Sequence, residues 1–313
     1  MTESGTGWRL HPAFRQFAAA RTDLSPENLD VVRRSLDSRR RESAAALDPG
    51  GVEISDETAE FEGRSVAVRV YRGRPSPAPA VVYCHSGAFV LGNLDTDHLQ
   101  CVEFARRAEC TVISVGYRLA PEHPHPAAVD DALTALRWAV AESSGLRVDS
   151  SRIAVAGSSA GGALAALLAQ AAAAGSAPPV VFQLLHQPVL DDRSTPSQRE
   201  FTSTPGFDGP AVEQMWRYYL RGAHPTEPAR SAAPARRADV TGLAPTFISC
   251  SELDPLRDEA LDYARRLLGA GVATELHVFP GTCHGFDSLL PDWEVSRQLF
   301  ALQSAALRRA LHD

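Results

Sequence analysis

The stretch RIAVAGSSAGGALAALLAQAAAA, residues 152–174, decides the fold of this chain. Its first seven residues make an apolar run that predicts a buried strand. The alanines and leucines after the glycines predict a helix, because both residue types have high helix propensity. Between strand and helix stands the pattern G-x-S-x-G, from Gly157 through Ser159 to Gly161. A serine in such a strand-to-helix turn occupies the position of a nucleophile elbow.

Ser159, and not Ser158, is the central serine of this pattern. For Ser158 the flanking glycines would have to stand at positions that hold Ala156 and Ala160. Glycines suit such a turn because it is sharp and neighbouring chains come close to it. The N-terminus of the following helix also favours negative charge in front of Ser159. The alternative interpretation is a glycine-rich turn with a structural role only.

Strands and helices alternate on both sides of this stretch. Apolar runs at 80–85, 111–117, 180–190, 245–250 and 273–279 predict further strands, and runs at 97–109, 127–142, 256–271 and 293–311 predict helices. This order predicts an α/β fold with a mainly parallel central sheet flanked by helices. Residues 52–73 alternate around a glycine and predict an antiparallel hairpin at the sheet edge.

Two stretches lie outside this alternation. Residues 8–47 are rich in arginine and predict helices without a strand, and residues 191–242 are rich in Pro, Ser and Arg. An insertion between two strands usually forms a cap over one end of the sheet. Within it, Met215, Trp216 and Tyr219 fall at helical spacing and predict one apolar face. That face either packs the cap onto the core or lines a substrate pocket.

Composition limits the class of protein. The 313 residues fit one α/β domain, residues 1–313, and the net charge of −7 argues against nucleic acid as a partner. We expect a cytoplasmic protein, because the sequence has no apolar signal region and no run that could span a bilayer. The five cysteines are odd in number and include no C-x-x-C pair, which predicts buried free thiols.

A serine hydroxyl needs a base and an orienting acid to become a nucleophile. Asp254 follows the strand predicted at 245–250, and His284 follows the strand predicted at 273–279. Sites in parallel sheets lie beyond the carboxyl ends of the strands. The order serine, acid, histidine is also the order of a hydrolase built on a nucleophile elbow. We therefore predict Ser159, Asp254 and His284 as the catalytic residues.

Other candidates for these roles are weaker. Asp258 lies one helical turn beyond Asp254 and is better explained as a first-turn helix residue. Glu252 is too close to the strand end, and Cys283 lacks any signature of a reactive thiol.

Nothing in the sequence indicates a metal or a cofactor. His123 and His125 form an H-x-H pair, but no third ligand accompanies them. We interpret the pair as part of a surface loop and expect no metal and no cofactor.

Acyl transfer also needs donors for the oxyanion. One donor is the N–H of Ala160, directly after the serine, and others come from the loop HSGAFVLGN at 85–93.

With these motifs in hand, the chain resembles the hormone-sensitive-lipase-like branch of α/β-hydrolase esterases. The resemblance runs from about residue 60 to the end. It is carried by HSGAFVLG, YRLAPEHPHPAAVDD, GSSAGG, DPLRDE and CHGF. It implies an α/β-hydrolase fold with a helical cap formed by about 1–47 and 191–242.

The resemblance also implies roles for single residues. Ser159 would be the nucleophile, His284 the general base and acid, and Asp254 the orienting acid. The backbone N–H groups of Gly87, Ala88 and Ala160 would form the oxyanion hole.

Two further implications concern the surroundings of the oxyanion hole. His85 would support the loop without acting as the base. Phe89 would join Met215, Trp216 and Tyr219 as a candidate pocket residue.

The sequence departs from the family pattern at three positions. Ser86 and Ala88 replace two glycines of the usual H-G-G-G-[FW] loop, and Ser158 replaces the aspartate of the usual G-D-S-A-G-G elbow. We expect Ala88 to keep its donor role, because alanine is small and only a required positive φ would exclude it.

The predicted function is a serine carboxylesterase acting on small, fairly apolar esters with short to medium acyl groups. A deacetylase or amidase of one specialised metabolite is a second reading. A third is a non-catalytic ligand-binding protein, since plant gibberellin receptors resemble this family and lack the catalytic histidine. The presence of His284 argues against that reading. The expected partner is a small-molecule ester, and a homodimer stays open as the oligomeric state.

Overall fold

The computed structural model describes residues 9–73, 77–222 and 231–313. Within them the sheet has the order β1-β2-β4-β3-β5-β6-β7-β8. Its strands are β1 Glu53–Phe61, β2 Arg64–Arg72, β3 Ala78–Cys84, β4 Thr111–Val115, β5 Val148–Ser158, β6 Phe182–His186, β7 Thr246–Leu253 and β8 Thr274–Cys283. Strands β1, β2 and β4 pair antiparallel, and all pairs from β4 to β8 are parallel. The mainly parallel sheet is therefore confirmed.

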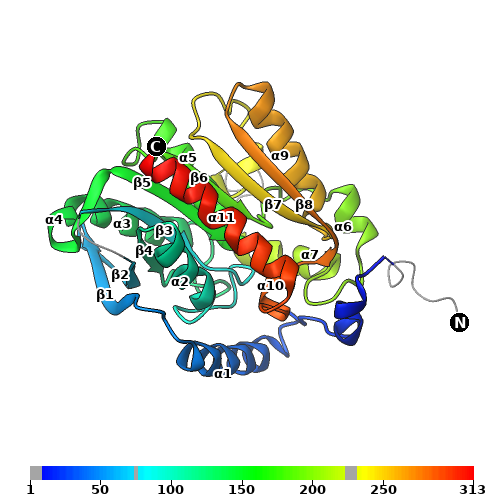
Figure 1. Cartoon of the computed structure of the whole chain (residues 1–313). Coiled ribbons are helices and arrows are strands. Elements are labelled where there is room, and N and C mark those ends of the chain that lie inside the picture. The colour runs from blue at the N-terminus through cyan, green and yellow to red at the C-terminus, as the bar shows by residue number, and fades with distance from the viewer. Residues whose placement is uncertain (1–8, 74–76, 223–230) are drawn as a thin grey trace, which may run out of the picture.

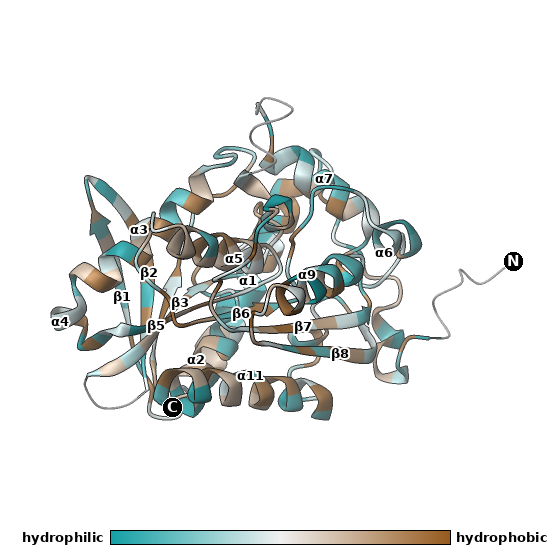
Figure 2. Cartoon of the chain, turned by 90° about the horizontal axis from the view of Figure 1, so that it is seen from above, coloured by the Kyte–Doolittle hydropathy of each residue, from teal (hydrophilic) through white to brown (hydrophobic). Residues whose placement is uncertain are grey.

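Helices cover both faces of the sheet. Helices α2 (His98–Arg107) and α11 (Glu294–His312) lie on one face, and α3 (Ala127–Ala141), α5 (Ala160–Ala173) and α9 (Arg257–Gly269) lie on the other (Figures 1 and 2). Two short helices, α4 (Ser143–Leu146) and α10 (Phe286–Leu289), lie in the connections. None of the described helices is long and apolar enough to cross a bilayer.

Helix α5 is the central helix of its layer. Every residue from Ala160 to Gln170 is buried. A helix that is apolar on all sides needs such an environment. Its small residues let it lie close to the sheet, which fixes the turn that precedes it.

The hairpin β1–β2 forms one edge of the sheet, as predicted. Phe61 pairs with Arg64, so only Glu62 and Gly63 form the turn. Both have positive φ, 49° and 77°. A two-residue turn of this kind matches the twist of the paired strands.

Strands β6 and β8 each end four residues away from the predicted position. Strand β6 ends at His186 rather than 190, because Gln187 has φ 44° and Pro188 has no N–H to donate. Strand β8 continues to Cys283 rather than 279, passing through Pro280 and Gly281. It is the last strand of the sheet, where a proline is tolerated.

The two stretches outside the alternation meet each other. The first holds the 3-10 helix η1 (Pro12–Phe17) and α1 (Leu29–Ala46); the second holds α6 (Pro196–Glu200), α7 (Gly209–Tyr219) and the 3-10 helix η2 (Pro234–Arg236). The N–H of Thr22 donates to the carbonyl of Gly206 at 2.9 Å, and the N–H of Gly206 donates to Ala20 at 3.1 Å.

The described part of the stretch 8–47 holds η1 and α1 and no strand, as predicted, and residues 20–22 between them contact Gly206 through an isolated bridge at Arg21. The cap ranges of 1–47 and 191–242 include 1–8 and 223–230, which lie outside the described residues. The cap assignment stays a prediction.

All five cysteines are free and buried. This confirms the expected buried thiols. Burial raises the pKa of the Cys84 and Cys110 thiols to about 12, because an apolar surrounding disfavours the thiolate.

Candidate active site

Ser159 lies in the sharp turn between β5 and α5. Its backbone has φ 55° and ψ −117°, a conformation that few non-glycine residues adopt. A Cβ on Gly157 would lie 2.2 Å from the carbonyl oxygen of Gly161, and one on Gly161 would lie 1.9 Å from that of Cys84. Both contacts are impossible, so Gly157 is required by the tightness of the turn itself and Gly161 by the close approach of β3.

Asp254 and His284 reach Ser159 from the ends of neighbouring strands. Asp254 follows β7 and His284 follows β8, and these strands pair in the sheet. His284 Nε2 lies 3.0 Å from Ser159 Oγ, and His284 Nδ1 lies 2.8 Å from Asp254 Oδ2. The structure thus brings the three predicted side chains into one hydrogen-bonded chain.

The carboxylate of Asp254 is fixed on both oxygens. Oδ2 faces His284 Nδ1, and Oδ1 accepts the N–H of Leu256 at 2.8 Å. The side chain is fully buried. A carboxylate held in this way keeps the proton of the imidazole on Nδ1, which leaves Nε2 to accept a proton from Ser159.

The weaker candidates for acid or nucleophile have other contacts. Asp258 Oδ2 accepts the N–H of Ser197 at 2.8 Å and joins α9 to α6. Glu252 accepts the N–H of Gly281 at 2.8 Å and pairs with Arg9 at 2.9 Å. Burial, helped by the nearby Asp254, raises the pKa of the Cys283 thiol to about 12, so its thiolate is scarce at neutral pH.

The loop after β3 carries the candidate oxyanion donors and has unusual backbone angles. Gly87, Ala88 and Phe89 have φ of 134°, 55° and 58°. The carbonyl of Gly87 accepts the N–H groups of Val90 at 3.0 Å and Leu91 at 2.8 Å, which closes the loop as a tight turn.

The expectation that Ala88 would not require a positive φ is wrong. An L-residue in the left-handed region costs roughly 1 kcal/mol relative to glycine. Among the residues that the structure describes, no hydrogen-bond acceptor engages the N–H groups of Gly87, Ala88 or Ala160. Ala88 therefore takes its conformation at the cost of backbone strain, and the role of these three N–H groups as oxyanion donors stays a prediction.

His85 is buried beneath this loop. Its ring stacks on Tyr117 with centroids 4.1 Å apart, and Nδ1 donates to the carbonyl of Ser86 at 2.8 Å. Burial lowers the pKa of His85 to about 4, opposed by the bond to Ser86 and reinforced by the charge of Arg40. A neutral, buried imidazole suits the supporting role that the resemblance implies.

Asp97 contacts the loop after β3, and it was not identified from the sequence. Its carboxylate accepts the N–H of Ser86 at 2.7 Å and the hydroxyl of Ser86 at 3.0 Å. An aspartate directly before a helix is normally read as an N-cap, yet this side chain makes no cap bond to α2. Ser86, which replaces a glycine of the family pattern, thus ties the loop to Asp97.

The four candidate pocket residues are all buried. Phe89 stacks on Tyr219 with centroids 3.7 Å apart and an interplanar angle of 4°, and Trp216 lies 6.1 Å from Phe89. Met215 of the same helix is fully buried. Helix α7 therefore packs directly against the candidate oxyanion loop, and a role in the substrate pocket stays a prediction.

Two more residues, from the stretches 8–47 and 191–242, contact His284 or the loop after β3. Neither of them was singled out from the sequence. The ring of Phe207 lies 5.0 Å from that of His284. Arg33 of α1 donates to the carbonyls of Val90 and Ala120, both at 2.7 Å. An exposed-looking arginine in a basic helix and an aromatic residue in a loop carry no local signal for such contacts.

His125 of the H-x-H pair contacts other parts of the chain. His125 Nε2 bonds to the hydroxyl of Ser231 at 2.9 Å, and its backbone N–H donates to the carbonyl of Tyr219 at 2.8 Å. Within the described ranges, no group of three or more His, Cys, Asp or Glu side chains could hold a metal ion. His125 instead joins the loop before α3 to the end of α7.

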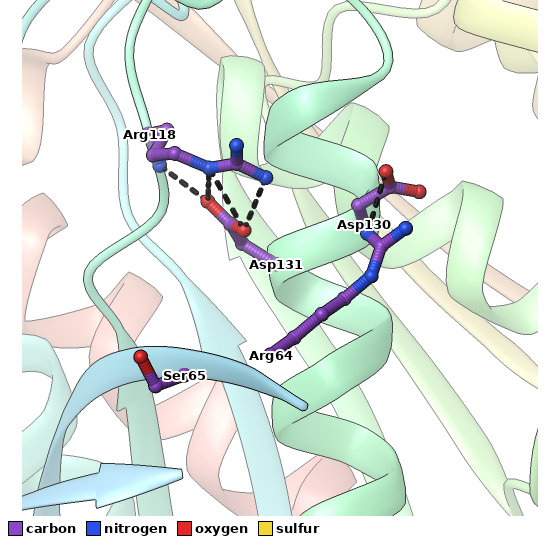
Figure 3. Close-up of a pocket in the computed structure, with 5 residues that line it drawn as sticks. All are labelled: Arg64, Ser65, Arg118, Asp130 and Asp131. Carbon is purple, nitrogen blue, oxygen red and sulfur yellow. Dashed lines mark hydrogen bonds and ion pairs between the residues drawn. The ribbon is translucent and has the colours of Figure 1, made fainter. Parts of the chain in front are cut away.

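A cavity of about 360 Å³ lies away from the triad, between the hairpin and α3 (Figure 3). Its lining residues are Arg64, Ser65, Arg118, Asp130 and Asp131. Arg64 pairs with Asp130 at 2.7 Å and Arg118 pairs with Asp131 at 2.8 Å. The four charged side chains that line it are therefore paired with one another.

Known proteins resemble this chain over almost its whole length. Residues 81–288 match the family model described as alpha/beta hydrolase fold. Carboxylesterase NlhH of Mycobacterium tuberculosis is 40% identical over 299 residues, which cover 93% of this chain and 92% of that protein.

Two solved structures show the same likeness. Esterase LipW from Mycobacterium marinum has a TM-score of 0.95 and 56% identity, covering 100% of this chain and 99% of that one. A bacterial heroin esterase has a TM-score of 0.92 and 38% identity, covering 98% and 100%.

Proposed function

Because the chain belongs to the α/β-hydrolase family and is a carboxylic ester hydrolase, we propose that it cleaves small, fairly apolar esters through an acyl-enzyme on Ser159. Short to medium acyl groups are the proposed range. The reading as a ligand-binding protein without catalysis is set aside, because the relatives are named as esterases.

One observation carries this proposal: the chain of hydrogen bonds from Ser159 through His284 to Asp254, at 3.0 and 2.8 Å. In the first half-reaction Ser159 Oγ attacks the ester carbonyl and His284 Nε2 takes its proton. The alcohol then leaves with that proton. In the second half-reaction His284 takes a proton from water, which attacks the acyl-enzyme; His284 then returns the proton to Ser159 Oγ as the bond to the acyl group breaks and the acid leaves.

Asp254 acts through His284 in this scheme. Its buried carboxylate holds the imidazole in the orientation that aims Nε2 at Ser159, and it stabilises the imidazolium that forms during each half-reaction. The charge that develops on the ester oxygen would be bound by the N–H groups of Gly87, Ala88 and Ala160.

The size range rests on the groups around the serine. Phe89, the residue after Ala88 in the loop that carries the candidate oxyanion donors, stacks on Tyr219 with ring centroids 3.7 Å apart, and both side chains are buried. An apolar, closely packed wall favours small apolar substrates over large polar ones. The capping stretches would shape the acyl and alcohol sides of the pocket.

A series of p-nitrophenyl esters of increasing acyl length tests the proposal. We expect kcat/KM to be highest for short to medium chains and to fall for long ones. A maximum at long-chain esters would overturn the size range and leave the ester chemistry intact. Loss of all turnover on every ester would contradict the proposal itself.

A deacetylase or amidase of one specialised metabolite is the second candidate. The likeness to a protein named as a heroin esterase favours it. Comparing kcat/KM for a panel of acetylated metabolites with that for simple acetates separates the two. A preference of about 100-fold or more for one acetylated metabolite would support the second candidate.

We place the enzyme in the cytoplasm in this proposal. The support is the set of five buried free thiols, which suits a reducing compartment. Fractionation of cells that express the protein tests the location, and activity found mainly outside the cytoplasmic fraction would contradict it.

A further inference from the structure

The segment 186–189, directly after β6, holds the backbone of Ser159 on both sides. The N–H of Ser159 donates to the carbonyl of His186 at 2.8 Å. The carbonyl of Ser159 accepts the N–H of Val189 at 3.0 Å. The position of the nucleophile therefore depends on where this segment lies.

The side chain of Gln187 in the same segment brackets His284. Its Oε1 accepts the N–H of Gly285 at 2.7 Å, and its Nε2 lies 3.5 Å from the carbonyl of Cys283. These groups belong to the residues directly after and before His284. One amide side chain thus contacts the backbone on both sides of the predicted base.

Gln187 also contacts Ser251, which in turn bonds to the backbone beside His284. Gln187 Nε2 donates to Ser251 Oγ at 2.6 Å, and the hydroxyl of Ser251 donates to the carbonyl of Cys283 at 3.0 Å. Ser251 belongs to β7, the strand that ends directly before Asp254. The amide is therefore bonded to the elements that carry both the base and the acid.

Both the backbone conformation and the burial of Gln187 are energetically unfavourable. It is 1% exposed and has φ 44°, which is unfavourable for a residue with a side chain. Burying a primary amide also costs free energy unless its hydrogen bonds are made. Strain in a buried polar residue that contacts a reactive site is a recognised sign of a functional constraint.

His186 supports the same loop further along. Its Nε2 lies 3.2 Å from Asp287 Oδ1, and its Nδ1 lies 2.8 Å from Ser249 Oγ. Asp287 stands three residues after His284, so two successive side chains of the segment hold the loop that carries the base.

The geometry points to Gln187 as a positioning residue that fixes His284 relative to Ser159. It touches neither substrate nor reacting atoms and acts through the backbone of residues 283 and 285. This role rests on the proposed function of Ser159 and His284. The segment 186–189, which directly follows β6, then sets the distance between Ser159 and His284 through its contacts to both.

The test compares Gln187→Leu with Gln183→Leu. Gln183 is also a fully buried glutamine of β6, and it bonds to Thr246 Oγ1 at 2.9 Å, at the end of the strand away from the triad. Both substitutions remove amide hydrogen bonds at similar volume. We expect Gln187→Leu to lower kcat by about 10- to 100-fold with KM changed less than about threefold, because a small misplacement of a catalytic group costs that much. Gln183→Leu should lower Tm without that loss of kcat.

One further measurement and one further variant complete the experiment. The downfield proton resonance of the His284–Asp254 hydrogen bond should broaden or move in Gln187→Leu and stay in Gln183→Leu. Gln187→Asn is a second variant, since asparagine tolerates a positive φ and its shorter side chain cannot span both contacts; it should lose kcat, and its Tm should fall no further than that of Gln187→Leu.

The outcomes separate this inference from the proposed function. Full kcat and an unchanged resonance in both Gln187 variants would overturn the positioning role, and so would equal kcat losses in Gln187→Leu and Gln183→Leu. A fully active Ser159→Ala would overturn the proposed function instead.

Discussion

Arg33 of helix α1 donates from Nε to the carbonyl of Val90 at 2.7 Å, which joins a helix of the N-terminal stretch to the oxyanion loop. Its Nη2 also donates to the carbonyl of Ala120 at 2.7 Å, and it pairs with Glu122. The carbonyls of Val90 and Ala120 belong to buried residues and would lose their charged donor if Arg33 were replaced.

We therefore expect Arg33→Met to lower both Tm and kcat/KM, the latter by about tenfold, because unsatisfied buried carbonyls cost roughly 1–3 kcal/mol. Arg34→Met is the control, since Arg34 is exposed on the next position of α1. Thermal unfolding and p-nitrophenyl acetate kinetics measure both effects. Equal behaviour of the two variants would show that the contact to Val90 has no influence on the loop.

Ser159→Ala should lower kcat by about 10⁵-fold, since members of a triad act as one unit. The fold should survive, because only a small hydroxyl group is lost. Ser158→Ala is the matched control and should remain active, as Ser158 ends β5 beside His186 and has no bond to His284. An inactive Ser158→Ala beside an active Ser159→Ala would show that the assignment of the motif is wrong.

Asp254→Asn should lower kcat by about 10⁴-fold, because an amide favours the wrong tautomer of His284. Asp258→Asn should be mild, since its carboxylate faces Ser197 and Arg257 rather than the base. Steady-state kinetics on the same short ester compare the two. A severe loss in Asp258→Asn with an intact fold would exchange the roles of these carboxylates.

Ala88→Gly should raise turnover by a few-fold on small and bulky esters alike. Glycine reaches φ 55° without the cost of roughly 1 kcal/mol that alanine bears, so the donor conformation is held more firmly. Acetates of primary and tertiary alcohols measure the effect. A gain confined to the tertiary alcohol esters would show instead that the methyl group acts by occupying space.

His85 should make the protein less stable in acid. Its pKa is lowered to about 4 in the folded state, whereas the unfolded chain binds a proton near 6.5. Its contribution to stability is therefore present above pH 6.5 and is lost as the pH falls towards 4, by about 3 kcal/mol in all. His85→Asn keeps a donor near the Nδ1 position. In this variant the free energy of unfolding, measured in urea at several pH values, should correspond to the uptake of up to one proton less on unfolding. An unchanged pH dependence would contradict the buried neutral imidazole.

Ser159, Asp254 and His284, whose side chains lie within hydrogen-bond distance of one another, could be singled out from the sequence because each of them has a local signal. Gly157 and Gly161 mark a turn that tolerates no side chain, and Asp254 and His284 each follow an apolar strand. Since neighbouring parallel strands end at the same edge of a sheet, local patterns suffice to bring these residues together.

The supporting residues could not be predicted in this way. Arg33 contacts Val90 across 57 positions and Gln187 contacts Gly285 across 98 positions, and neither lies in a motif. Asp97 falls at the start of the helix predicted at 97–109 and carries no signal for its contact to Ser86, and the positive φ of Ala88 follows from the closed turn of its loop rather than from residue type. Such features depend on tertiary contacts, which outweigh local preference.

The buried thiols have a practical consequence for anyone handling this enzyme. Cys283 stands directly before His284 and is fully buried, with an alkaline pKa of about 12. An alkylating reagent cannot reach its sulfur while the loop is closed, so labelling proceeds only at the rate at which that region opens. The rate of alkylation of this cysteine therefore reports local unfolding next to the proposed base. Inactivation by such reagents would measure the rate of that unfolding and would not indicate a catalytic thiol.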